Sequence, residues 1–165
     1  LITAKSEPVF GGVYKLAAIE DTAGQIIPKI KISETVTKIT TPHFKKVYRL
    51  FDRETGHALA DYICVHDEAV DDTKPLTIFD PDATWKQKEL TNFTARELLQ
   101  PIYQGGKLVY DKPTLQQSRE YCLSQLDTLW DEIKRFDNPQ TYYVDLSQKL
   151  YDIKMELLRA NGQGR

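Results

Sequence analysis

The side chains best suited to metal binding in this sequence are three histidines and a short acidic run. His66 is followed by Asp67 and Glu68, and all three side chains can ligate a metal. Consecutive residues at a strand end point in different directions, so one ion is poorly held by all of them. We interpret the run as a solvated acidic loop. His57 follows a turn glycine and is expected to be exposed, and the remaining histidine is His43.

A nucleophile needs a base within hydrogen-bonding reach, and the chain offers no such local pair. Ser6 and Ser33 have no partner nearby in sequence, and neither Cys64 nor Cys122 adjoins a histidine or a helix N-terminus. The G-x-S-x-G, H-E-x-x-H and C-x-x-C motifs do not occur. The glycine pairs at 11–12 and 105–106 are isolated, which indicates turns rather than a phosphate-binding loop.

The placement of the two cysteines in the sequence indicates a reducing environment. Cys64 lies in an apolar, strand-like run, and Cys122 falls on the apolar face of a predicted helix. We expect both to be buried free thiols in a reducing compartment. A disulfide between them is the open alternative, because spacing alone does not decide the pairing.

Basic and aromatic residues alternate in one strand-like segment, a pattern also found in nucleic-acid-binding proteins. Lys45, Lys46 and Arg49 are interleaved with Phe44 and Tyr48. The whole chain has 22 basic and 24 acidic residues and a net charge of −2, so it has no global field to attract nucleic acid. The segment is interpreted as the solvated face of a strand, and no nucleic-acid partner is expected.

Composition indicates a soluble globular chain. Hydrophobic residues make up 41% and charged residues 28% of 165 residues, and no apolar run approaches the ~18 residues that span a bilayer. No signal-peptide pattern and no membrane partner are therefore expected. The sequence begins with Leu1, and its only methionine is Met155. We expect a fragment of a longer protein.

The first half of the chain, residues 1–92, is predicted to be rich in antiparallel strands. Strands are expected at the start (1–4), at 13–19 and at 26–32, where isoleucines alternate with Lys29 and Lys31. A hairpin is predicted from 47–51 and 58–65 around Gly56, and a short strand at 76–79.

The second half, residues 93–165, is predicted to be mostly helical. The spacing of Thr94 and Glu97 predicts a capped short helix, and 102–110 predicts a small hairpin. A second capping box, Thr114 with Gln117, begins a predicted amphipathic helix that reaches residue 136. Another is predicted to start at 138–139 and to end at 161–162. The class is therefore α+β, with hairpins followed by an antiparallel pair of amphipathic helices.

Several strings in this chain resemble the C-terminal part of nicotinate phosphoribosyltransferases. The most specific are Gly-Gly-Val-Tyr-Lys-Leu at 11–16 and the lysine-alternating Pro-Lys-Ile-Lys-Ile-Ser-Glu at 28–34. The order continues with Lys-Lys-Val-Tyr-Arg-Leu at 45–50 and the Asp-Arg-Glu-Thr-Gly turn at 52–56. The similarity runs over nearly the whole chain.

The resemblance implies that the longer protein makes nicotinate mononucleotide from nicotinate and phosphoribosyl pyrophosphate, in pyridine nucleotide (NAD) biosynthesis in the cytoplasm. The resemblance also implies that the longer enzyme couples the reaction to ATP hydrolysis through a phosphorylated histidine, uses magnesium, and works as a homodimer. The family's phosphate loop and phospho-acceptor histidine lie upstream of residues 1–4, so the resemblance places no catalytic residue, cofactor or metal here. Lys5 and Ser6, just after that loop, are the only positions expected near substrate.

The chain itself is then expected to be an inactive structural region that packs on a catalytic barrel, the β-rich residues 1–92 most directly. The alternative from another class is a stand-alone interaction module that binds a partner through a strand edge or helix face. Relatives that act on nicotinamide or quinolinate are the alternatives within the enzyme class.

Overall fold

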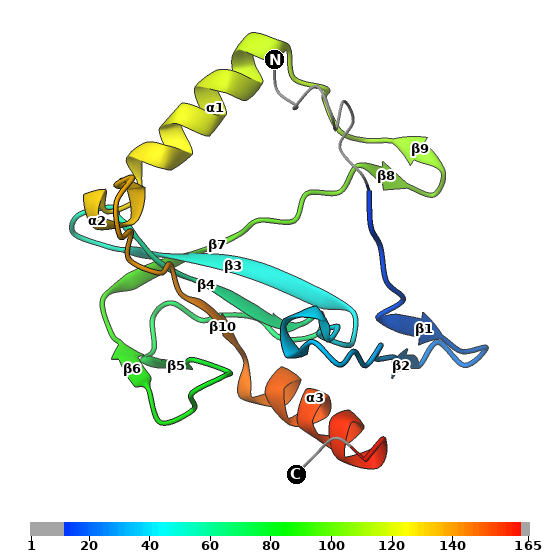
Figure 1. The fold of residues 1–165 in the computed structure, drawn as a ribbon. Helices are drawn as coiled ribbons and strands as arrows, with labels where there is room; N and C mark the ends of the chain where they lie inside the picture. Colours follow the sequence, from blue (N-terminus) through cyan, green and yellow to red (C-terminus); the bar gives the residue numbers. More distant parts are fainter. Residues whose placement is uncertain (1–11, 163–165) are drawn as a thin grey trace, which may run out of the picture. The chain divides into compact units, whose positions relative to one another are not determined.

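The computed structural model describes residues 12–162, which fall into two compact units. One unit contains the described residues up to Phe44 and those from Ile153 onward, and the other is Lys45–Asp152. The protein has the α+β class that we predicted, with antiparallel hairpins first and helices towards the C-terminus (Figure 1). The strand predicted at 1–4 lies outside the described residues. The packing of residues 1–92 on a barrel stays a prediction.

The smaller unit contains a short antiparallel hairpin, β1 (Ala18–Glu20) with β2 (Ile26–Pro28), followed by the 3-10 turn η1 (Val36–Lys38). The carboxylate of Asp21 accepts the N–H groups of Ala23 and Gln25 and so closes the hairpin turn. Both strands are shorter than predicted. The alternation at 26–32 is present in the sequence, but the strand register ends at the pair of Ala18 with Pro28, beyond which the N–H of Lys29 still donates to the carbonyl of Ala17 at 2.8 Å.

The larger unit is built on a four-stranded sheet in the order β10-β4-β3-β7 (Figure 1). β3 (Lys45–Asp52) and β4 (Ala58–Val65) form the predicted hairpin, and Gly56 has the left-handed φ of +72° that its turn requires. Leu50 pairs with Ala60 and Phe51 with Ala58, so Leu59 is the extra residue of a β-bulge. The predicted strand at 76–79 is confirmed as β5 (Leu76–Phe79), which pairs with β6 (Gln87–Leu90).

One face of this sheet carries the core, because β3 and β4 alternate buried and less buried residues with a period of two. Phe93 at the start of β7 is fully buried and completes this core. The buried cluster consists of Tyr48, Leu50, Ala60, Tyr62, Cys64, Ile78, Leu90 and Phe93.

The segment predicted as a capped helix at 94–97 is instead strand β7 (Phe93–Glu97). β7 pairs antiparallel with β3, and Phe93 and Ala95 face the core. Capping chemistry satisfies only the first N–H groups of a helix, whereas the β3 ladder and the burial of Phe93 act along the whole segment. Tertiary pairing therefore overrides the local motif.

The small hairpin predicted at 102–110 is confirmed as β8 (Tyr103–Gln104) with β9 (Lys107–Leu108). Its two loop residues, Gly105 and Gly106, both have positive φ, as the tightest hairpin turns require.

The predicted helix after Thr114 exists, but it is shorter than the apolar spacing indicated. α1 (Leu115–Asp127) begins at the predicted Thr114–Gln117 capping box, and a four-residue α2 (Asp131–Lys134) follows. α1 contains no buried residue. Its apolar side therefore remains at the surface of this unit within the described residues.

The restart predicted at 138–139 is wrong. Asn138 has a left-handed φ of +47°, and the following residues lead into β10 (Val144–Leu146), which pairs parallel with β4. α3 (Gln148–Ala160) begins only after Ser147, whose hydroxyl accepts the N–H of Leu150 as an N-cap does. Its end at Gly162, φ +78°, agrees with the prediction. None of the described helices is both long and apolar enough to cross a membrane.

Candidate functional site

The two positions singled out from the sequence as near substrate, Lys5 and Ser6, lie outside the described residues. Within the described part, no group of three or more histidine, cysteine, aspartate or glutamate side chains could hold a metal ion.

The acidic run at 66–68 is partly solvated, as interpreted, since Asp67 is exposed, but both of its carboxylates also form hydrogen bonds. Glu68 accepts the N–H of Val65 at 2.7 Å and the hydroxyl of Ser147 at 2.8 Å. The two carboxylate oxygens of Asp67 accept hydrogen bonds of 2.8 and 2.7 Å from the ammonium of Lys149. These bonds join the end of β4 to the start of α3, so the acidic pair has a structural role.

His57, predicted to be exposed, is half-buried against Trp130. The two rings stack with their centroids 4.1 Å apart and an interplanar angle of 18°. Nδ1 of His57 is buried without a hydrogen-bond partner in the described structure. The contact was missed because Trp130 is 73 positions away in the chain.

The cysteines differ from each other. Cys64 is a buried free thiol, as predicted, and burial raises its pKa to about 11. Cys122 is also a free thiol but is exposed on α1, which corrects the prediction of burial. The apolar spacing around Cys122 is present in α1, but none of its residues is buried: Cys122 borders an open hollow that Arg49, Asp61 and Tyr142 also line.

The strongest polar cluster joins two strands and the segment before β10. Arg49 donates from Nε and Nη2 to the two carboxylate oxygens of Asp61, at 2.8 and 3.0 Å, and Tyr142 donates to Oδ1 at 3.0 Å. The Asp61 carboxylate raises the pKa of Arg49, and burial raises that of Tyr142. The groups neutralise one another, so the cluster stabilises the sheet and leaves no free acid or base.

One buried acid has no such partner. Asp145 on β10 is 3% exposed, and no hydrogen bond or ion pair reaches its carboxylate from the described residues. Burial, with a further contribution from the charge of Asp80, raises the pKa of Asp145 to about 6. Sequence analysis missed it because 144–146 was assigned to a helix.

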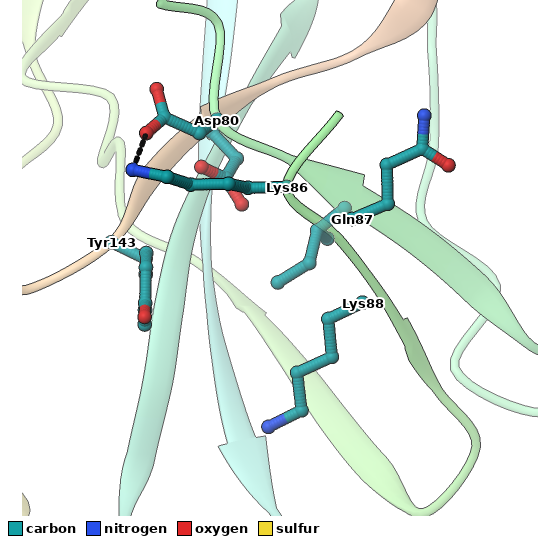
Figure 2. A pocket seen from close by; sticks show the side chains of 7 residues that line it. Asp80, Lys86, Gln87, Lys88 and Tyr143 are labelled. Carbon is teal, nitrogen blue, oxygen red and sulfur yellow. Dashed lines mark ion pairs between the residues drawn. The ribbon is translucent and has the colours of Figure 1, made fainter. Parts of the chain in front are cut away.

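Asp145 lies where two hollows meet, of about 390 and 640 Å³, both of which are also lined by Asp80, Lys86 and Tyr143. Figure 2 shows Lys86 directed at Asp80, with the ring of Tyr143 and the side chain of Lys88 alongside. The Lys86–Asp80 ion pair is long, 3.7 Å. We call this combined hollow the Asp145 pocket. It is a polar, partly apolar recess with one buried, uncompensated carboxylate.

Comparison with known proteins relates most of the chain to one family. Residues 44–154 match the family described as "Nicotinate phosphoribosyltransferase C-terminal domain". A nicotinate phosphoribosyltransferase of Bacillus subtilis is 42% identical over 94% of this chain, and one of Dictyostelium discoideum is 31% identical over 92%. The chain spans only 32% and 26% of the lengths of these two relatives.

A solved structure agrees in fold. The crystal structure of human nicotinic acid phosphoribosyltransferase superposes with a TM-score of 0.63 and 26% identity, over 70% of this chain and 23% of that one. The matched residues 44–154 almost coincide with the compact unit Lys45–Asp152.

Proposed function

Because the chain belongs to the nicotinate phosphoribosyltransferase C-terminal domain family, we propose that it is the structural C-terminal region of such an enzyme. The enzyme would form nicotinate mononucleotide from nicotinate and phosphoribosyl pyrophosphate, with ATP hydrolysis, in NAD biosynthesis in the cytoplasm. In this proposal ATP and magnesium bind in the part of the enzyme outside this chain, and the chain alone turns over no substrate.

The single observation that carries the proposal is the coincidence of the family match with one folded unit. The match begins one residue before Lys45 and ends two residues after Asp152, so it covers the sheet, its core and residues 148–154 of α3. A sequence match that follows the boundaries of a packed core identifies a domain rather than a shared short motif.

The polar groups of this unit support a structural role. Arg49 forms an ion pair with Asp61, and Lys149 forms one with Asp67, both within hydrogen-bonding distance. Each of these pairs connects elements of the unit instead of presenting a charge to a ligand. Such pairing positions strands and a helix, which is what a supporting domain needs.

The proposal also includes the interactions of the longer enzyme: this region packs on the catalytic barrel, and the full-length enzyme is a homodimer. Lys5 and Ser6 remain the positions proposed near substrate.

Co-purification tests this function. The upstream part of the enzyme, carrying an affinity tag, would be co-expressed with this chain and purified through the tag. We expect the chain to be retained in a one-to-one ratio, and a Phe93→Ala variant with a disrupted core to be retained less. Failure to retain the intact chain on a folded upstream part would contradict the proposal and favour a stand-alone interaction module.

A further inference from the structure

The Asp145 pocket contains an anion that the described fold does not neutralise. Asp145 is almost fully buried, and Asp80, the charged group that acts on its carboxyl, has the same sign. Removing a carboxylate from water without a partner is strongly unfavourable. A group that supplies positive charge and donors at this point would remove that penalty.

The charges that line the pocket favour a cation over an anion. Asp82 adds a third carboxylate beside Asp80 and Asp145. Lys86 is engaged with Asp80 across 3.7 Å, and its side chain is 64% exposed, so its ammonium lies towards solvent. Lys88 lines the smaller of the two hollows but not the larger one, which therefore has three carboxylates and one ammonium. An anionic ligand would be repelled by the buried carboxylate of Asp145.

The geometry favours a planar, extended cation over a metal ion. The three carboxylates line a common recess, but they do not converge as metal ligands within the described structure. A guanidinium group presents five donors over a plane and can bind a carboxylate with two of them. Tyr143 is 57% exposed and supplies an aromatic wall, on which a guanidinium can also stack. The volumes fall within the range of about 300–1,000 Å³ usual for binding sites.

We propose that the Asp145 pocket is a binding site for the guanidinium group of an arginine side chain on a docked protein segment. Asp145 is the buried charge partner, Asp80 and Asp82 line the approach, and Tyr143 holds the plane of the group. Lys86 competes with the incoming cation for Asp80. The site is a property of this chain alone and does not depend on the proposed function.

Nuclear magnetic resonance titration of the isotope-labelled chain tests the site, with Nα-acetyl-arginine methylamide as the probe. The matched control is Nα-acetyl-citrulline methylamide, which has nearly the same shape and no charge. We expect the arginine probe to shift the amide signals of 143–147, with a millimolar dissociation constant at least about tenfold below that of citrulline. Equal binding of the two probes, or no shift at 143–147 with either, would overturn the proposal.

Variants of the chain identify the partner groups. Asp145→Asn should remove the preference for arginine, whereas Asp131→Asn, at a side chain that is 94% exposed and does not line the pocket, should keep it. If Asp145→Asn does not fold, Lys86→Gln provides the second measurement. Removing the competing ammonium should tighten binding of the arginine probe several-fold, and weaker binding would contradict the proposed arrangement.

Discussion

Arg49 on β3 and Asp61 on β4 are direct cross-strand partners and form a two-pronged ion pair on the face opposite the core. Both side chains are largely buried, 20% and 16% exposed, and Tyr142 closes over them from the segment before β10. The pair therefore fixes the register of the central hairpin and also attaches the chain that leads to β10.

Breaking this pair should destabilise the protein measurably. Asp61→Asn removes the charge that Arg49 and Tyr142 bind, and we expect the free energy of unfolding in urea to fall by about 2 kcal/mol. Tyr142→Phe removes one hydrogen bond and should cost about 1 kcal/mol. Lys74→Met, at an exposed pair with Asp71, is the control and should cause no measurable change. Equal effects of Asp61→Asn and Lys74→Met would contradict this role.

Two phenylalanines give a test of the core. Phe93 is fully buried, and Phe136 is 99% exposed. Phe93→Ala should lower the free energy of unfolding by about 3–5 kcal/mol, because it leaves a cavity, whereas Phe136→Ala should change it by less than about 0.5 kcal/mol. Thermal or urea unfolding of both variants measures these changes in the free energy of unfolding. A large loss from Phe136→Ala would show that α2 and its flanks pack on something in solution.

The two thiols should react at very different rates. Cys122 is exposed, while Cys64 is buried with a pKa raised to about 11, so little thiolate forms at neutral pH. Under native conditions we expect iodoacetamide to modify Cys122 first, and Cys64 only after unfolding. Mass spectrometry of tryptic peptides measures both sites in one sample. Equal modification of the two cysteines in the folded protein would be inconsistent with this core.

The buried acid should make stability depend on pH. The pKa of Asp145 is about 6 in the folded state and near 3.8 when unfolded, so the folded state holds its proton more tightly. This contribution to stability is greatest below pH 3.8 and is lost as pH rises through about 6. The other titratable groups that line the pocket or interact with Asp145 are Asp80, Asp82, Lys86, Lys88, Tyr143 and Tyr62.

Asp145→Asn isolates that contribution, because the amide does not titrate. Relative to the wild type, the variant should gain stability as pH is raised from 4 to 7. The measurement is urea unfolding of both proteins at several pH values. A stability difference that stays constant over this range would show that Asp145 does not titrate as the structure indicates.

The elements predicted correctly are those whose signals are local. The hairpin around Gly56, the glycine pair of the β8–β9 turn and the capping box at Thr114 each require particular residues at adjacent positions. Their chemistry is the same in the sequence and in the folded chain, so the pattern is sufficient.

The errors occur where distant residues decide the structure. At Thr94–Glu97 the capping motif is real, but pairing with β3 and burial of Phe93 turn the segment into a strand. At 144–146 the apolar spacing also fits a helix, and only the parallel pairing with β4 selects a strand. The Asp145 pocket could not be predicted for the same reason, since Asp80 and Asp145 meet only through β5 and β10.

Formation of nicotinate mononucleotide tests the central claim most directly. The assay supplies nicotinate, phosphoribosyl pyrophosphate, ATP and magnesium to this chain alone, to the upstream part alone, and to the two co-expressed. The structural role predicts product only from the co-expressed pair. Product from the chain alone, or full activity from the upstream part without it, would contradict the account.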